Sequence, residues 1–217
     1  MSMPNVLSET RSIANRFIAE LRDVHIQQDS MRFRRNLERI GEVMAYEISK
    51  TLDYQEISVE TPLGNAIEAV PSDQIVLAAI MRAGLPMHQG MLNYFDRASN
   101  AFISAYRAHS EDGSFEIQLE YVTAPDLDGK ILIIADPMLA TGSSMERTLR
   151  KLSELGTPKT IYVASIIAAR QGVMHIRRLY PQVKIWVGAI DEELTARAYI
   201  VPGLGDAGDL AYGAKTE

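Results

Sequence analysis

Short apolar runs that alternate with amphipathic segments constrain this chain more than any other feature. Four runs are apolar almost throughout, which is typical of strands buried on both faces of a sheet. Helical periodicity lies between them, as in the segment 144–155. Strands that alternate with helices of about ten residues predict an α/β fold, with a parallel central sheet flanked by helices and joined by right-handed crossovers. The four runs are Ile75–Met81, Ile131–Ala135, 161–168 and 183–190.

The chain outside these runs is expected to add helices and a hairpin. A helix is expected from Asp29 or Ser30 onward, because apolar residues recur there at steps of three and four, and a second helix over 3–27. Strands at 55–59 and 66–70 flank a Pro-Leu-Gly-Asn turn and predict a hairpin. Further strands are expected at 101–106 and, as an arm, at 115–122. Roughly the last thirty residues, rich in glycine and charge, are expected to be loop.

Length and composition exclude several classes of protein. A length of 217 residues without a repeat or linker predicts one domain over 1–217, with the N-terminal helical segment 1–51 included. The net charge of −6 argues against a nucleic acid partner. The absence of cysteine excludes disulfides and thiolate metal sites. No apolar run reaches the ~20 residues of a membrane span, and no signal-peptide core is present, so we expect no membrane partner and a cytoplasmic location.

The segment 131–144 is the candidate for chemistry. The strand Ile131–Ala135 ends in Asp136, and a loop of small residues leads into the next helix. Ligands of open parallel sheets bind at the carboxyl ends of strands, and the free N–H groups of a helix start suit a phosphate. Asp136 is suited to accept hydrogen bonds from hydroxyls, as on a ribose. The alternative interpretation is an ordinary strand, turn and capped helix.

Hydroxyl groups and a capping pattern support the interpretation of this segment as a phosphate site. Ser143 is expected to cap the helix, and Glu146 lies three positions later, as in a capping box. Thr141, Ser143 and Ser144 can donate hydrogen bonds to an anion. A P-loop is excluded, because Ser143 rather than lysine follows Gly142.

Two arginines and a glycine-rich tail are the other candidates. Arg82 and Arg107 each follow a predicted strand, and such a pair could hold a pyrophosphate. The tail matches G-x-G-x-x-G at 203–208, but too little chain follows for a dinucleotide site. We interpret it as a glycine-bent loop that brings backbone amides and Asp206 close to a flat ligand.

Several other polar groups receive structural interpretations. The histidines lack metal-ligand spacing and are interpreted as surface or helix-face residues. The acidic run 191–193 is interpreted as a solvated loop. A group of arginines is interpreted as solvating a helix. These are His25, His88, His109 and His175, and Arg32, Arg34 and Arg35.

Four segments resemble the motifs of the uracil phosphoribosyltransferase family, in that family's order. They are MRAGL at 81–85, AYR at 105–107, DPMLATGSS at 136–144 and YIVPGLGDAGD at 199–209. The resemblance extends from about Gln28 to the C-terminus. It implies the type I phosphoribosyltransferase fold, with a hood and a β-arm. It also implies an enzyme, a pentosyltransferase of pyrimidine salvage that converts uracil and phosphoribosyl pyrophosphate to UMP and pyrophosphate with Mg²⁺.

The resemblance also implies residue roles. The loop from residue 140 to 144 would hold the 5′-phosphate, Asp136 the ribose hydroxyls, and Arg82 and Arg107 the pyrophosphate. Asp206 and Arg107 would be catalytic, with Asp206 taking the uracil proton or ordering a water that does. The implied phosphoribosyl pyrophosphate site is Arg82, Arg107, Asp136, Pro137, Met138, Leu139, Ala140, Thr141, Gly142, Ser143, Ser144 and Asp206. The implied uracil site is Ile200, Gly205, Asp206 and Ala207.

This sequence departs from the family pattern at two positions. Ser143 replaces a usual glycine, which would cost energy if that position needs a positive φ. Leu210 stands where a basic residue is usual. Asp136 is followed by Pro137 rather than by a second acid, as in the family, so Mg²⁺ would be held mainly by substrate oxygens and water, and no residue is assigned as a metal ligand.

Three alternatives remain. One is a regulatory RNA- or nucleotide-binding protein on the same fold, which would need a basic face. Another is a phosphoribosyltransferase for a different base, and the third is a catalytically silent nucleotide sensor. A homo-oligomer, dimer or tetramer, is expected with uracil and phosphoribosyl pyrophosphate as small-molecule partners.

Overall fold

The computed structural model describes residues 3–109 and 115–215, and the side chains of 3–104 and 121–215. Its centre is an eight-stranded sheet in the order β1-β10-β9-β7-β4-β5-β6, with the short β8 also on β9. Its pairs are parallel except β5 with β6. The strands are β1 Asn5–Val6, β4 Ile75–Met81, β5 Ser99–His109, β6 Phe115–Thr123, β7 Ile131–Ala135, β8 Met138–Leu139, β9 Thr160–Ala169 and β10 Lys184–Asp191.

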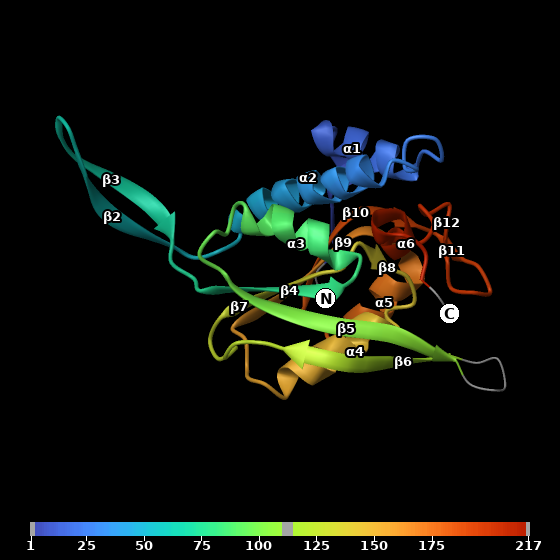
Figure 1. The fold of residues 1–217 in the computed structure, drawn as a ribbon. Helices are drawn as coiled ribbons and strands as arrows, with labels where there is room; N and C mark the ends of the chain where they lie inside the picture. Colours follow the sequence, from blue (N-terminus) through green and yellow to red (C-terminus); the bar gives the residue numbers. More distant parts are fainter. Residues whose placement is uncertain (1–2, 110–114, 216–217) are drawn as a thin grey trace.

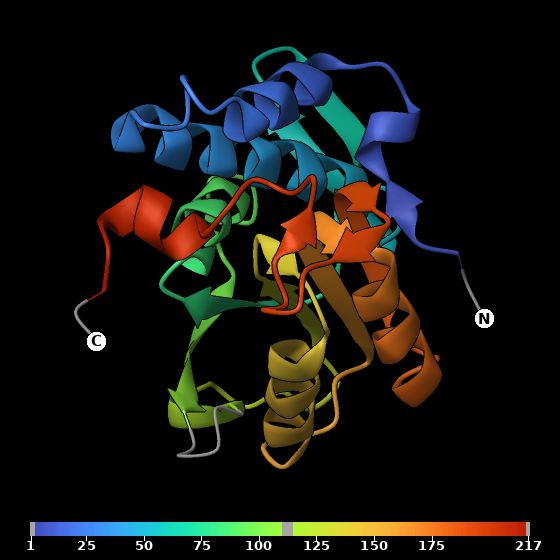
Figure 2. The same cartoon turned by 90° about the vertical axis from the view of Figure 1, so that its right-hand side faces the viewer.

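Helices cover both faces of this sheet, so each central strand is buried on two sides (Figures 1 and 2). One apolar core lies between the sheet and α1, α2 and α3, and a second lies between the sheet and α4 and α5. This explains the nearly continuous apolar runs of β4, β7 and β9. The helices are α1 Ile13–Arg22, α2 Ser30–Ser49, α3 Gly84–Leu92, α4 Ser143–Ser153, α5 Arg170–Leu179 and α6 Ala207–Tyr212. The predicted α/β class is confirmed.

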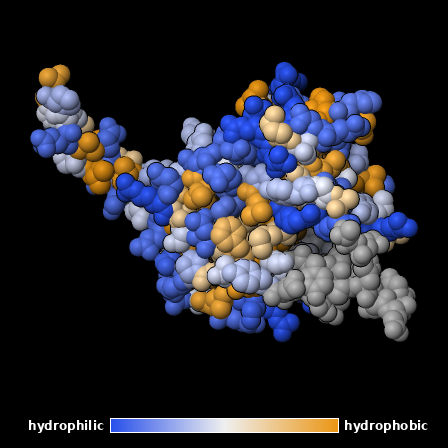
Figure 3. Space-filling view, viewed as in Figure 1, coloured by the Kyte–Doolittle hydropathy of each residue, from blue (hydrophilic) through white to orange (hydrophobic). Residues whose placement is uncertain are grey.

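The predicted hairpin is a projecting arm. β2 Tyr54–Thr61 and β3 Gly64–Pro71 form a two-stranded sheet of their own, which extends away from the body of the molecule (Figure 1). Its apolar side chains include Leu63, which is fully exposed, and Ile67, and they appear as orange patches along the arm in Figure 3. Among the residues that the structure describes, none of β2 or β3 belongs to either of the two main cores.

Three local expectations were wrong. The segment 3–27 is not one helix, because the chain first adds β1 to the sheet edge and forms a 3-10 turn at Leu7–Glu9, and α1 starts only after Ser12, whose side chain caps it. The strand expected as an arm at 115–122 is β6, which pairs with β5 in the main sheet. The C-terminal part is not all loop, because β11 Glu193–Leu194, β12 Ile200–Val201 and α6 form there.

In the described part of the chain, no helix has the length and apolar character needed to cross a membrane.

Candidate active site

The candidate site lies at the carboxyl ends of β4 and β7, in the middle of the sheet. From β4 the chain continues outward to β5, whereas from β7 it continues to β9 and β10 on the other side. Such a reversal leaves a crevice where open α/β sheets bind ligands. The two loops approach closely, because a Cβ on Gly84 would lie 2.6 Å from the Ala135 carbonyl oxygen. The structure therefore brings Arg82, directly after β4, and Asp136, directly after β7, to the same edge.

The loop between β7 and α4 forms a cradle of backbone amides, here called the phosphate cradle (residues 140–144). The Pro137 carbonyl oxygen accepts hydrogen bonds from the amides of Ile166 and Ile167, at 3.0 and 2.9 Å, which ties the loop to β9. Gly142 then turns the chain into α4 with φ of 89°, a left-handed conformation that favours glycine. The first amides of α4 have no partner within the helix and carry the positive end of its dipole, so they can bind an anion.

The predicted capping box is wrong. Gly142, not Ser143, is the N-cap, and no side chain caps the helix. The Ser143 amide donates to the Thr141 hydroxyl at 3.3 Å, and the two hydroxyls are 3.0 Å apart. Glu146 instead contacts His175, because α5 packs beside the first turn of α4. Ser143 lies inside the helix, so its replacement of the family glycine needs no positive φ.

The other predicted residues of this loop differ in accessibility. Pro137 and Leu139 are buried, and Leu139 belongs to the core below α4. Met138, Ala140 and Thr141 are partly exposed, as are Ser143 and Ser144. The hydroxyls of the phosphate cradle are thus accessible, whereas buried Leu139 shapes the loop.

Asp136 is held in an unusual electrostatic environment. Burial raises the pKa of Asp136 to about 7, and the Met138 amide, 3.4 Å from Oδ1, opposes this shift. A group that is costly to ionise in the free protein is stabilised as a carboxylate when a ligand donates hydrogen bonds to it. Asp136 is therefore suited to accept bonds from two neighbouring hydroxyls.

Arg82 reaches across to the C-terminal part of the chain. Its Nη2 donates to Asp209 Oδ1 at 2.9 Å and to the Gly213 carbonyl oxygen at 3.1 Å. Arg107 lies in β5, where its backbone is in register with Ile117 of β6, but its side chain is outside the described part. The predicted convergence of Arg82 and Arg107 on one anion therefore stays a prediction.

The C-terminal tail (residues 200–213) bends through two glycines and then forms α6. Gly203 and Gly205 have φ of 57° and 93°, and a Cβ on Gly203 would collide with the Ile200 carbonyl oxygen. Asp206 caps α6, because its Oδ1 accepts a hydrogen bond from the Asp209 amide at 3.0 Å. Ile200 and Ala207 are buried, so these two residues can offer a ligand backbone groups rather than side chains.

A partly buried ion pair fixes this tail to the N-terminal helix α1. Arg22 of α1 donates to both carboxylate oxygens of Asp191 at 2.8 Å and to the Gly203 carbonyl oxygen at 2.9 Å. The Gly203 amide in turn donates to Asp191 at 2.9 Å. Burial acts to raise the pKa of Asp191, but the bonds from Arg22 and Gly203 outweigh it and lower that pKa. The interpretation of 191–193 as a solvated loop is therefore wrong for Asp191, which is buried and ends β10.

The arginines of α2 also do more than solvate a helix, which corrects the earlier interpretation. Arg34 donates to the Ala211 carbonyl oxygen of α6 at 2.7 Å and lies over the Tyr212 ring. Arg32 pairs with Glu20 of α1 at 2.9 Å. This pairing, together with the Asn36 amide, lowers the pKa of Glu20 to about 2 although burial opposes the shift. Nothing in the spacing of these residues reveals their partners, which lie far away in the sequence.

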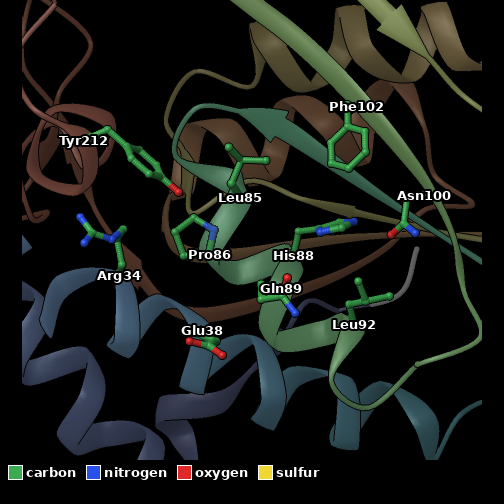
Figure 4. A pocket seen from close by; sticks show the side chains of 10 residues that line it. All are labelled: Arg34, Glu38, Leu85, Pro86, His88, Gln89, Leu92, Asn100, Phe102 and Tyr212. Carbon is green, nitrogen blue, oxygen red and sulfur yellow. The ribbon is translucent and has the colours of Figure 1, made fainter. Parts of the chain in front are cut away.

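Two of the histidines, His88 and His175, lie on helices as predicted, in α3 and α5. His88 is buried and tilts against the Phe102 ring at 5.3 Å, and burial lowers the pKa of His88. It lines a hollow of about 550 Å³ between α2, α3, α6 and β5 (Figure 4), which also contains Arg34 and Tyr212. No residue of the predicted site lines this hollow, so we do not place the ligand there. His175 contacts Glu146.

The described residues contain no group of three or more His, Asp or Glu side chains that could hold a metal ion. Asp136 is the single acid at the end of β7, followed by Pro137. This donor set fits a magnesium ion that is bound mainly by oxygens of a phosphorylated ligand and by water, as Mg²⁺ commonly is in phosphate sites.

Comparisons with known proteins decide the family. The family model described as uracil phosphoribosyltransferase matches residues 8–214. The chain belongs to the uracil phosphoribosyltransferase family. Membership confirms the predicted resemblance and, with it, a pentosyltransferase of type I phosphoribosyltransferase fold.

Relatives of the uracil phosphoribosyltransferase family come from bacteria and archaea. A protein of that name from Porphyromonas gingivalis is 57% identical over 96% of this chain and 97% of its own length. One from Pyrococcus furiosus is 39% identical over 90% of this chain and 84% of its own. Among solved structures, the AQ2163 protein from Aquifex aeolicus has a TM-score of 0.88 and 32% identity, over 99% of this chain and 100% of that one.

Proposed function

We propose that this chain transfers the phosphoribosyl group of phosphoribosyl pyrophosphate to uracil, which yields UMP and pyrophosphate in pyrimidine salvage. The observation that carries the proposal is the position of the phosphate cradle and Asp136 at the reversal point of the sheet, with the C-terminal tail fixed by Arg22 and Arg82. Family membership over residues 8–214 supports the same reaction.

The sugar phosphate binds at the cradle. Amides and hydroxyls of residues 140–144 hold the 5′-phosphate at the start of α4. Asp136 accepts hydrogen bonds from the ribose hydroxyls, and this carboxylate, whose ionisation burial makes costly, gains partners that stabilise its charge. Pro137, Met138 and Leu139 set the path of the loop between these two subsites.

The C-terminal tail recognises the base. Backbone groups of Ile200, Gly205 and Ala207 bond the polar edge of uracil, because fixed amides and carbonyls can distinguish a pyrimidine edge from others. Asp206 lies between base and sugar. Its Oδ1 is bonded to the Asp209 amide, which leaves Oδ2 to accept the uracil proton or to order a water that does.

Departure of pyrophosphate leaves positive character at the anomeric carbon, so catalysis depends on positioning and charge stabilisation. Arg82 and Arg107 stabilise the leaving group, and Arg82 must exchange its contact with Asp209 for the pyrophosphate. Mg²⁺, when bound, neutralises charge on the phosphate oxygens. The ribose is held by Asp136 while the base is held by the tail, so the reacting atoms are aligned.

The test is an assay of purified protein with phosphoribosyl pyrophosphate, Mg²⁺ and each nucleobase in turn. We expect UMP and pyrophosphate from uracil, and no nucleotide from adenine, guanine or hypoxanthine. Asp206→Asn should lower the rate with uracil strongly, by roughly 100-fold or more, as for loss of an acid–base group. Equal use of another base, or no turnover with any base, would contradict the proposal.

Three further features belong to this proposal. We treat residues 1–217 as a single domain, because α1 and α2 share one core with the sheet. We place the protein in the cytoplasm as a homo-oligomer of two or four chains. Size-exclusion chromatography with light scattering tests the oligomeric state.

A further inference from the structure

Glu146 presents an electrostatic problem for a phosphate site. Its side chain lies in the first turn of α4, next to the amides of the phosphate cradle. The helix dipole stabilises an acid at this position in the free protein. A sugar phosphate brings its own negative charge to the same helix terminus, however, so an uncompensated Glu146 carboxylate would oppose its binding.

His175 of α5 supplies the compensating group. Its Nε2 lies 2.6 Å from Glu146 Oε2, and both side chains are only partly exposed. Tyr180, directly after α5, donates from its hydroxyl to the Glu146 carbonyl oxygen at 3.4 Å. His175 and Tyr180 therefore contact the first turn of the helix whose amides would bind the phosphate.

His175 also packs against the cradle itself. A Cβ on Gly142 would lie 3.0 Å from His175 Cδ2 and 3.2 Å from the Gly172 carbonyl oxygen. A Cβ on Gly172 would collide with the Ala140 carbonyl oxygen. The N-terminal half of α5 is thus the rear wall of the cradle, and Figure 2 shows α4 and α5 side by side. His175 is therefore packed directly against the cradle.

The other charged groups near His175 are mostly cationic. His175 lines a hollow of about 670 Å³ together with Arg177 and Arg178 of its own helix and the Arg170–Glu192 ion pair. Arg170 already has Glu192 as its partner, and Glu146 is the carboxylate that contacts His175.

We propose that His175 is a positioning residue for phosphoribosyl pyrophosphate. By bonding the Glu146 carboxylate it offsets that negative charge and holds α5 against the phosphate cradle, so that the cradle accepts an anion. This inference rests on the proposed function for the identity of the ligand, but the pair itself is independent of what is transferred.

If His175 offsets the charge of Glu146, the two single variants should change the KM for phosphoribosyl pyrophosphate differently. If His175 only braces the helix, both should raise it. His175→Gln should raise the KM for phosphoribosyl pyrophosphate by roughly 3- to 30-fold, the range expected for a charge at a helix terminus, and leave kcat and the KM for uracil within about twofold. Glu146→Gln should leave that KM unchanged or lower it, because it removes the repulsion. The double variant should return to within about threefold of wild type. A simple brace predicts that all three variants weaken binding.

The Arg170–Glu192 pair offers a matched control, because it lies on the same helix but is exposed. The double variant Arg170→Gln/Glu192→Gln should leave the KM unchanged, and His175→Lys, which can still donate a hydrogen bond to Glu146, should retain most of the affinity. Thermal unfolding of each variant checks that it is folded.

A binding measurement separates this inference from the proposed function. Calorimetric titration with ribose 5-phosphate needs no turnover, and His175→Gln should weaken its binding by the same factor as the KM. Unchanged binding in His175→Gln, or a double variant as weak as His175→Gln, would overturn the role of His175. If wild type forms no UMP while these binding differences persist, the proposed function fails and the role of His175 stands.

Discussion

The phosphate cradle and the C-terminal tail belong to the same candidate site but are held in place in different ways. The cradle is one continuous stretch between β7 and α4, fixed by backbone bonds to the neighbouring β9, such as that from the Asp136 amide to the Ala164 carbonyl oxygen at 3.1 Å. The tail is held by side chains from distant parts of the chain, namely Arg22, Arg34 and Arg82.

The two parts of the site should therefore respond differently to substitutions. The geometry of the cradle follows from the sheet, the helix start and the α5 residues packed behind it, so substitutions in α1 and α2 should leave sugar-phosphate binding intact. The geometry of the tail depends on α1 and α2, so substitutions far from the crevice should alter base binding alone. Four variants test this separation, from the largest expected effect to the smallest.

Asp191→Asn should have the largest effect, on the tail. It leaves Arg22 without its buried counter-charge and weakens the bond from the Gly203 amide. Arg22 is partly exposed, so the cost should lie below the roughly 3–5 kcal/mol of breaking a fully buried ion pair, and the free energy of unfolding should fall by about 2–3 kcal/mol. The KM for uracil should rise more than the KM for phosphoribosyl pyrophosphate. Denaturant titration and steady-state kinetics measure both.

The neighbouring Glu192→Gln is the control for this variant, because Glu192 is exposed. An equal rise of both KM values in Asp191→Asn would show that tail and cradle are not separable.

Gly142→Ala should act on the cradle. The left-handed φ of 89° and the close approach to His175 and the Gly172 carbonyl oxygen both oppose a Cβ, at a cost of about 1–3 kcal/mol. We expect the KM for phosphoribosyl pyrophosphate to rise. The affinity for uracil, and the contacts with the base of UMP, should change little. A loss confined to uracil would contradict the separation. Gly129→Ala, at another positive φ but with open space around it, controls for backbone strain alone.

Asp136→Asn should stabilise the free protein while it impairs the enzyme. The folded-state pKa of about 7 lies above the ordinary 3.8, so the folded state binds more protons than the unfolded state between about pH 4 and 7. The free energy of unfolding therefore falls as pH rises through that window. The variant should gain about 1–2 kcal/mol at pH 8, less than the ~4 kcal/mol of the full shift because the group is partly hydrated.

Chemical denaturation of wild type and Asp136→Asn near pH 4 and at pH 8 measures this effect, and the two proteins should converge at the lower pH. A constant difference across that range would show that Asp136 does not titrate there.

Ser143→Gly should have the smallest effect. Ser143 is already helical, so glycine relieves no strain, and it removes the contact with the Thr141 hydroxyl. We expect a loss of about 0.5–1 kcal/mol in stability, the helix penalty of glycine, and a KM for phosphoribosyl pyrophosphate within about threefold of wild type. A gain in stability, measured by thermal unfolding, would show that serine is strained there.

The same contrast explains what could be predicted from sequence. The strands β4 and β7 and the placement of Asp136 follow from local apolar runs, which are strong where both faces of a strand are buried. The capping box was wrong because α5, far along the chain, takes the Glu146 side chain. Helix α6 was missed because it is short and is stabilised by Arg34 from α2 rather than by its own periodicity.

The buried Asp191 shows the same limit at the site. It lies in an acidic run that resembles a solvated loop, and only the approach of Arg22, which lies 169 positions earlier, makes its burial favourable. Pairings at such separations leave no periodic signal in one sequence. The role of Arg107 stays a prediction because its side chain is outside the described part.

The three arginines that hold the tail have a consequence for protein engineering. A glycine-rich segment copied from this chain onto another scaffold would arrive without the guanidinium groups that give it its shape. Transplanting pyrimidine selectivity would require the graft to include Arg22 with Asp191, and Arg34 and Arg82, as well as the segment that we propose binds the base.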